Sequence, residues 1–292
     1  MLRSVVTVAT VSILAALVVA CSPIGILNAL TPADTYTVTG GLEYGPDPRH
    51  RLDVYQPRQS TEILLPGAGY PVVVFFYGGT WNSGERRDYK FVGEALASEG
   101  IVTIVADYRL YPQVRYPDFL QDCARAVAWA RREATRYGGD PQRLYLMGHS
   151  SGAYNAAMLA LDPRWLAAEG MSPAVLAGWI GLAGPYDFFP IENPDAKPVF
   201  FHPNYPPGSQ PIDYVSKMSP RAFLAVPVTD SLVNPERNTL QMAARLKAAG
   251  VPVTQRIYAE VNHVTLAGAI SRPLRWLAPV RNDVIAFVRA AR

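Results

Sequence analysis

Along most of the chain, short apolar runs alternate with longer segments whose apolar residues recur at helical spacing. The short runs predict strands and the longer segments predict amphipathic helices. Strands are expected near residues 35–39, 51–55, 71–77, 101–106, 143–148, 177–183, 222–228 and 252–258. Helices are expected near residues 87–99, 117–137, 151–161, 236–249 and 280–291. Regular alternation of this kind predicts an α/β fold with a mainly parallel, eight-stranded sheet covered by helices on both faces.

One long stretch, residues 185–220, breaks the alternation. It holds nine of the 26 prolines, together with several phenylalanines and tyrosines. Proline cannot sit inside a regular helix, so this stretch is expected to be irregular. Two interpretations remain open. The stretch is either a small cap that covers the site and shapes an apolar pocket, or a surface connection whose aromatic side chains only pack on the body.

The N-terminus has a different character from the rest of the chain. Arg3 follows two apolar residues, residues 5–20 are weakly polar to apolar throughout, and Cys21 follows the segment Val18–Ala20. The stretch is short for a membrane span. Small residues directly before a cysteine resemble the cleavage site of bacterial lipoproteins, so we expect residues 1–20 to be a lipoprotein-type signal peptide and Cys21 to be lipidated. A plain secretory signal and an uncleaved anchor are the alternatives.

This leader predicts an exported protein that is held on the membrane by its lipidated N-terminus. Ser22, rather than an aspartate, after the cysteine favours the outer membrane or the periplasmic face if the host has an outer membrane. Residues 21–34 are then a linker, and residues 35–292 form one α/β domain. With Cys21 acylated, Cys123 has no disulfide partner, and its helical spacing from apolar neighbours predicts a buried helix residue without chemistry.

Composition narrows the functional class. Hydrophobic residues make up 49% of the 292 residues and charged residues 17%, against about 25% charged in an average soluble domain. The chain can therefore bury a large core. Its net charge is +3 and it has no basic run, so we expect no nucleic acid partner.

The residues Gly148-His149-Ser150-Ser151-Gly152 follow an apolar strand and precede strong helix formers. This is the G-x-S-x-G pattern between a strand and a helix, in which a sharp turn exposes the central serine as a nucleophile. Glycine is needed on both sides because side chains there would collide with the neighbouring backbone. Ser150 is therefore the candidate nucleophile.

A serine hydroxyl needs a base that takes its proton and an acid that orients the base. In folds with this turn the chain order is serine, then acid, then histidine. Of the four histidines, His50 comes too early, His149 is adjacent to the nucleophile, and His202 fits a surface position better. His263 follows the last expected strand in a short loop, so it is the candidate base.

The acid is expected directly after the strand that precedes the histidine strand. Asp230 follows the run Phe223–Val228 and is the first choice. Asp187 also follows a strand and is the second choice, but it stands two residues after Pro185, where a turn already explains an aspartate.

Attack on a carbonyl creates a negative oxygen that preorganised backbone N–H groups must stabilise. One such group belongs to Ser151, the residue after the nucleophile. The others are expected in the Gly-rich loop Tyr77-Gly78-Gly79-Thr80-Trp81, which follows the strand near 71–77 about 70 residues before the serine.

Four motifs together resemble the hormone-sensitive-lipase-like branch of the α/β-hydrolases, which includes isoprenylcysteine methylesterases, kynurenine formamidases and bacterial carbohydrate-acyl esterases. The branch's His-Gly-Gly-x-Trp loop is similar to residues 77–81, its Asp-Tyr-Arg-Leu-x-Pro segment to 107–112, its lead-in to the serine turn to 137–143, and its acid loop to 230–235. The resemblance covers roughly residues 45–290. It implies the α/β-hydrolase fold for residues 35–292.

The resemblance also implies that Gly79, Thr80 and Ser151 donate to the oxyanion. Two features differ from the branch. Tyr77 replaces the loop histidine, and Val226-Pro227 replaces the His-Gly pair usually found before the acid.

We therefore expect a serine carboxylesterase with Ser150 as nucleophile, His263 as base and Asp230 as acid. It would hydrolyse a small-to-medium carboxylic ester through an acyl-enzyme, without a metal ion or an organic cofactor. An arylformamidase or another amidase with the same triad is the nearest alternative. A catalytically inactive ligand-binding lipoprotein is the alternative from a different class.

Overall fold

The computed structural model of the chain describes residues 23–58 and 69–290. The predicted signal peptide and Cys21 lie outside these residues. Within the described part, every helix is too short or too polar to cross a bilayer.

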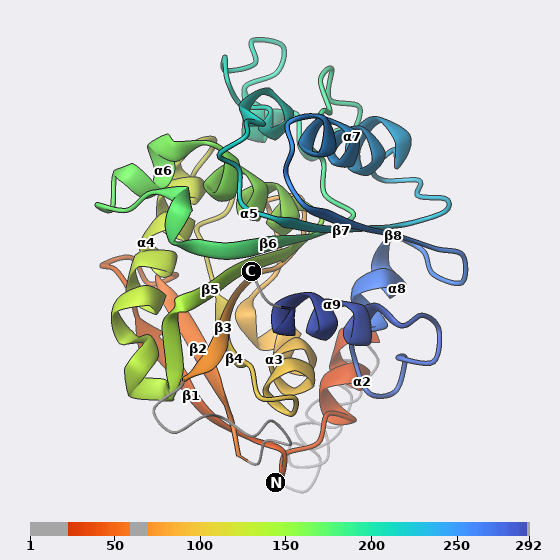
Figure 1. Cartoon of the computed structure of the whole chain (residues 1–292). Helices are drawn as coiled ribbons and strands as arrows, with labels where there is room; N and C mark the ends of the chain where they lie inside the picture. The colour runs from red at the N-terminus through yellow and green to blue at the C-terminus, as the bar shows by residue number, and fades with distance from the viewer. Residues whose placement is uncertain (1–22, 59–68, 291–292) are drawn as a thin grey trace, which may run out of the picture.

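The centre of the molecule is a twisted sheet whose strands, in the described residues, number eight (Figure 1). The strands are β1 Tyr36–Glu43, β2 Arg51–Pro57, β3 Tyr70–Phe76, β4 Val102–Ala106, β5 Gly139–His149, β6 Leu176–Leu182, β7 Ala222–Pro227 and β8 Val253–Tyr258. Their order in the sheet is β1-β2-β4-β3-β5-β6-β7-β8. β2 is antiparallel to both of its neighbours, and all the other pairs are parallel.

Helices cover both faces of the sheet, as the alternating pattern predicts. The α-helices are α2 Pro23–Ala29, α3 Lys90–Ala97, α4 Asp118–Glu133, α5 Ser151–Leu161, α6 Pro163–Ala167, α7 Gln241–Ala248, α8 His263–Gly268 and α9 Val280–Arg289. Short 3-10 segments are η1 Arg86–Tyr89, η2 Ala134–Tyr137, η3 Pro173–Val175, η4 Pro198–Phe200 and η5 Pro211–Tyr214, and η6 Glu236–Leu240 is a π-helix. In Figure 1, α3 and α9 pack together on one face, and α4, α5 and α6 lie on the other.

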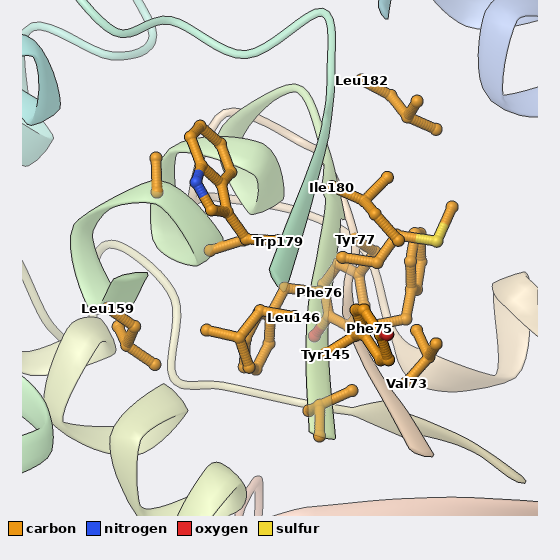
Figure 2. Close-up of a cluster of buried hydrophobic side chains, with 14 of the residues drawn as sticks. Val73, Phe75, Phe76, Tyr77, Tyr145, Leu146, Leu159, Trp179, Ile180 and Leu182 are labelled. Carbon is orange, nitrogen blue, oxygen red and sulfur yellow. The ribbon is translucent and has the colours of Figure 1, made fainter. Parts of the chain in front are cut away.

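The central strands read as unbroken apolar runs because both of their faces are covered. β6 and β7 are buried at every position, whereas the edge strand β1 is mostly exposed and the edge strand β8 is mostly half-buried or exposed. Figure 2 shows the consequence in the core: Trp179 and Ile180 are successive in β6 and point to opposite faces, with Leu159 of α5 on the Trp179 side. This rigid sheet fixes the positions of the loops that follow each strand.

The carboxyl ends of parallel strands meet at one edge of a sheet, where such folds bind ligands. Here β3, β5, β7 and β8 lead into the segments that hold the predicted site residues. Between β6 and β7, the stretch 185–220 is irregular apart from η4 and η5, in agreement with its proline content.

Three short helices were not expected from the sequence: α6, which lies between expected elements, and two that change the setting of an expected linker and an expected loop. The segment 21–34, expected to be a linker, contains α2, and Leu27 packs against the core. His263, expected in a loop, is the first residue of α8. Both helices have fewer than eight residues, which is too short for a periodic apolar pattern to stand out.

Candidate active site

Ser150 lies in the sharp turn between β5 and α5. Its backbone has φ 54° and ψ −124°, a region that residues other than glycine rarely adopt. A Cβ at Gly148 would lie 2.1 Å from the carbonyl oxygen of Gly152, and one at Gly152 would lie 2.0 Å from that of Phe76. Only glycine therefore permits this close approach of α5 to β3 and β5, which holds the serine in its strained conformation.

The structure brings the three predicted residues together. His263 Nε2 is 2.9 Å from Ser150 Oγ, and His263 Nδ1 is 2.6 Å from Asp230 Oδ2. The Asp230 side chain is fully buried and that of His263 nearly so. Because a carboxylate only accepts, Nδ1 carries the hydrogen, and Nε2 is left to accept a proton from the serine hydroxyl.

Backbone groups hold the Asp230 carboxylate in its charged form. Its Oδ1 accepts hydrogen bonds from the N–H groups of Leu232 (2.8 Å) and Val233 (3.0 Å). Burial by itself would raise the pKa of Asp230, but the hydrogen bond and charge of His263 and these two N–H groups lower the pKa below its ordinary value. The acid therefore stays ionised while it orients the imidazole.

His149 packs directly beside the predicted base. Its Nε2 lies 2.8 Å from the carbonyl oxygen of His263, and the two rings are 4.9 Å apart. A carbonyl oxygen only accepts, so Nε2 of His149 donates. Burial, together with the neighbouring His263, lowers the pKa of His149 to about 3, which keeps its ring neutral. The sequence excludes His149 as the base because it is adjacent to the nucleophile, but its hydrogen bond to the His263 carbonyl has no signature in the sequence.

The Gly-rich loop after β3 lies against the serine turn. A Cβ at Gly78 would be 3.0 Å from the Cβ of Ser150. Thr80 and Trp81 have φ of 54° and 58°, so this loop too has a rare backbone conformation. The Trp81 indole donates to Asn155 Oδ1 of α5 at 3.0 Å, which ties the loop to the helix behind the nucleophile.

Tyr77, which replaces the histidine of the resembling branch, is part of a buried polar network. Its hydroxyl donates to Asp107 Oδ1 (2.9 Å) and accepts from Arg49 (2.8 Å). Asp107 also accepts from the backbone and the guanidinium of Arg86, whose Nε donates to Asp53. Burial and the nearby Asp107 raise the pKa of Tyr77 well above its ordinary value. The tyrosine thus remains a neutral donor that fixes the base of the loop.

A cavity of about 280 Å³ opens beside the nucleophile. Thr80, Ser150 and Ser151 line it, whereas Gly79 does not contribute to its wall. The other walls come from Trp81, the 185–196 part of the irregular stretch and the 232–238 segment. Phe188 packs against Trp81 and Tyr154 within this wall. The irregular stretch 185–220 therefore lines part of the cavity and also packs against the α/β domain.

Asp187, the second choice for the acid, lies on the cavity wall. Its carboxylate pairs with Arg237 at 3.1 Å, and its backbone N–H donates to Asn238. Its charge is engaged by that arginine, and in the described part of the chain the acid on His263 is Asp230.

The remaining candidate groups lie in other settings. Cys123 is fully buried in α4, as its spacing predicts. His50 is buried beside Asp122, and His202 is exposed with its Nδ1 2.8 Å from the Tyr205 hydroxyl. Across residues 23–58 and 69–290, His, Cys, Asp and Glu side chains form no group of three that could hold a metal ion.

The chain is similar to a protein-family model and to known esterases. The BD-FAE family model matches residues 52–246. Isoprenylcysteine alpha-carbonyl methylesterase ICME of Arabidopsis thaliana is 34% identical over 158 residues, which are 53% of this chain and 36% of that protein. Esterase LipC of Mycobacterium tuberculosis is 30% identical over 77% of this chain and 57% of that protein. The chain spans about a third to a half of the length of the methylesterases it matches.

Solved structures of esterases share the fold. Esterase B of Lactobacillus rhamnosis superimposes with a TM-score of 0.72 at 17% identity, over 96% of this chain and 95% of that one. The Pyrobaculum calidifontis esterase gives a TM-score of 0.69 at 22% identity, over 91% and 89%. The predicted α/β-hydrolase fold is confirmed.

Proposed function

The chain belongs to the BD-FAE family, and from this premise we propose that it is a carboxylic ester hydrolase that works through a serine acyl-enzyme. One observation carries the proposal. Ser150, His263 and Asp230 form a continuous hydrogen-bonded chain, with distances of 2.9 Å and 2.6 Å, at the wall of a cavity. The esterases among the chain's relatives support the same chemistry.

The proposed reaction has two halves. Ser150 Oγ attacks the ester carbonyl while His263 Nε2 takes its proton, and the carbonyl oxygen becomes an oxyanion. The C–O bond to the alcohol then breaks, and the alcohol leaves with the proton from His263. Water attacks the acyl-enzyme in the same way, and the acid is released. Throughout, Asp230 holds the Nδ1–H and stabilises the imidazolium that forms.

The proposed oxyanion donors are the backbone N–H groups of Gly79, Thr80 and Ser151. Ser151 is the first residue of α5, so its N–H group is one that has no partner within the helix, and the helix dipole favours negative charge at that end. The rare backbone conformation of Thr80 supports this role, because strain of this kind gathers at functional loops.

We assign a small-to-medium ester as substrate. The cavity of about 280 Å³ is near the lower end of the range for small-molecule sites, roughly 300–1,000 Å³. Its wall combines apolar side chains such as Phe188 and Ile191 with the charged pair Asp187 and Arg237. Short acyl chains fit this space better than long ones.

For the location of the protein, we propose export and lipidation at Cys21. The support is the sequence of residues 1–21, with small residues directly before the cysteine. The membrane would then be a partner of the N-terminus. Globomycin-sensitive processing, and mass spectrometry of the mature N-terminus with a Cys21→Ser control, test this assignment.

The enzyme assignment is tested with p-nitrophenyl esters of increasing chain length, beside N-formylkynurenine. We expect turnover of the acetate and butyrate, a steep fall for long chains, and complete loss in Ser150→Ala with folding intact. An organophosphate should label Ser150. Labelling at Ser151 would contradict Ser150 as the nucleophile. Turnover of N-formylkynurenine alone would contradict the esterase assignment, and hydrolysis of neither substrate would favour a ligand-binding protein.

A further inference from the structure

An exposed surface of apolar and basic side chains surrounds the N-terminal helix α2. A Cβ at Gly268 of α8 would lie 3.1 Å from Leu274 Cδ1 and 4.0 Å from Leu27 Cδ1. Therefore α2, α8 and the segment 269–279 meet at this point, as Figure 1 also shows. We call this surface the α2 face and define it by Ile26, Leu30, Arg272, Arg275 and Trp276.

Trp276 is the most exposed large apolar side chain of this face, at 77%. The chain has five tryptophans, and the other four are buried or half-buried in the core. An indole in water forgoes a large hydrophobic gain. Its apolar ring and polar N–H suit it to the boundary between a bilayer and water, where tryptophan is enriched.

Ile26 of α2 and Leu30, which directly follows the helix, add exposed apolar area to the α2 face. Ile26 and Leu30 are 47% and 58% exposed, and their spacing of four places them one above the other on the same side. Leu27, the next residue after Ile26, packs against the core. The segment therefore packs on the core through Leu27 and leaves Ile26 and Leu30 exposed.

Basic charge accompanies this apolar area. Arg272 and Arg275 are exposed, and within the described residues neither has a carboxylate within 4.0 Å. The positive charges of both arginines act to lower the pKa of Glu94, but Glu94 is buried and adds no negative charge to the surface. Glu99 nearby is already paired with Arg281 and Arg289. The exposed charge that remains is positive, which suits anionic headgroups.

The chain itself indicates what covers this face. Cys21 precedes Pro23, the first residue of α2, by two positions. A fully extended chain spans at most about 3.6 Å per residue, so an acylated Cys21 holds the start of α2 within about 7 Å of the lipid. An anchor this short brings the surface around α2 to the headgroups.

We propose that the α2 face docks on an anionic lipid surface, with Trp276 in the interfacial layer and the two arginines on headgroups. The anchored protein then keeps one orientation relative to the membrane and does not rotate freely about its lipid anchor. This inference rests on the lipid anchor proposed above, and it adds a second, non-covalent contact.

Brominated lipids test the docking on the full, lipidated chain. The vesicles contain phosphatidylcholine with brominated acyl chains and about one quarter phosphatidylglycerol. Since Trp276 is the one highly exposed tryptophan of five, quenching should remove at most about one fifth of the emission. Trp276→Phe should abolish this loss and leave p-nitrophenyl acetate turnover unchanged, which shows that the variant folds.

A charge-matched pair tests the arginines. Arg272→Gln/Arg275→Gln should lower the ratio of docked to undocked protein by roughly fivefold per arginine, since each basic residue at an anionic surface contributes about that factor. Purely zwitterionic vesicles should weaken wild-type docking in the same way. Arg131→Gln/Arg136→Gln removes two exposed charges from α4 and η2 on the other face of the sheet and should have no effect.

The outcomes separate the two proposals. Protein that floats with vesicles but shows no quenching retains the anchor and overturns the docking. Protein that does not float overturns both. A dimer in solution that Trp276→Phe dissociates, with no quenching on vesicles, would assign the face to a second copy of the chain and also overturn the proposal.

Discussion

Asp230 interacts with three groups through its two oxygens. Oδ1 accepts from the N–H groups of Leu232 and Val233, and Oδ2 accepts from His263 Nδ1. The carboxylate is thus both a turn-former and the partner of the proposed base. A substitution that replaces only one carboxylate oxygen can therefore affect the contact with His263 and leave the turn contacts in place.

Asp230→Asn should keep the turn and lose the catalytic function. The amide oxygen can still accept from the two N–H groups, but the amide nitrogen then faces His263 and favours the wrong tautomer. Loss of the acid in serine triads costs on the order of 10⁴ in kcat. We expect kcat, measured by ester hydrolysis kinetics, to fall by that order, with little change in the midpoint of thermal unfolding.

Asp187→Asn is the matched control, because it alters the other aspartate that follows a strand. It weakens the pair with Arg237 on the cavity wall. We expect a rate loss of tenfold or less, equivalent to about 1.4 kcal/mol in the barrier. The reverse ranking of the two variants would place the acid after β6 and leave the Asp230 loop as a connection.

The positions of the candidate residues were predictable from the sequence, but their supporting contacts were not. Ser150 and His263 are marked by a local pattern and by chain order. The contact of His149 with the His263 carbonyl joins residues 114 positions apart. The Tyr77 network likewise depends on Arg49 and Asp107, which come from separate parts of the chain. No periodicity or motif encodes such pairs.

At the scale of elements, the cap of α8 matters because His263 is the first residue of that helix. Asn262 is the N-cap, and its side chain accepts from the N–H groups of Val264 (3.0 Å) and Thr265 (2.9 Å). Thr265 Oγ1 in turn accepts from the Asn262 N–H at 2.8 Å. The orientation of the proposed base therefore depends on a capping box immediately before it.

Asn262→Ala should lower both stability and turnover. Loss of an N-cap costs about 1 kcal/mol in the free energy of unfolding. Displacement of a catalytic group by about 1 Å can cost up to about 10²-fold in rate, so kcat should fall between severalfold and that limit. Denaturant titration and ester kinetics measure the two effects. Asn262→Ser keeps a capping oxygen and should recover most of both; a serine variant as impaired as the alanine variant would show that the cap is not the cause.

Element prediction succeeded where segments were long or fully buried. All eight strands and the five long helical regions lie close to their predicted positions. The predicted helices 87–99, 117–137 and 236–249 each combine an α-helix with a 3-10 or π segment. The helices α2, α6 and α8 were missed because two turns or fewer of helix show no stripe of apolar residues.

For the whole molecule, the sheet explains why four segments that are distant in the chain meet at the site. Parallel strands β3, β5, β7 and β8 deliver the loops after them to one edge. Chain order therefore sufficed to predict that Ser150, Asp230 and His263 would meet. The shape of the cavity could not be predicted in this way, because its wall comes from the irregular stretch 185–196 and from 232–238.

Acid stability offers a test at this scale, through His149. Its ordinary pKa of 6.5 falls to about 3 in the folded protein. Between these two pH values the unfolded chain binds a proton at His149 that the folded chain does not bind. The free energy of unfolding therefore decreases as pH falls from 6.5, by at most about 1.4 kcal/mol per pH unit from this group.

His149→Gln should flatten this dependence, since glutamine does not titrate and can still donate to the His263 carbonyl. At pH 4.5, two units below 6.5, protonation of His149 in the unfolded state should have lowered the free energy of unfolding of wild type by about 2.7 kcal/mol. The variant should not show this loss. Loss of the Asp230 carboxylate at low pH acts on both proteins and cancels in the comparison. Guanidinium titrations from pH 7 to 4 measure the slopes, and His202→Gln controls for the loss of a histidine as such. Equal flattening in both variants, or parallel slopes for wild type and His149→Gln, would mean that His149 is not a neutral group buried against the proposed base.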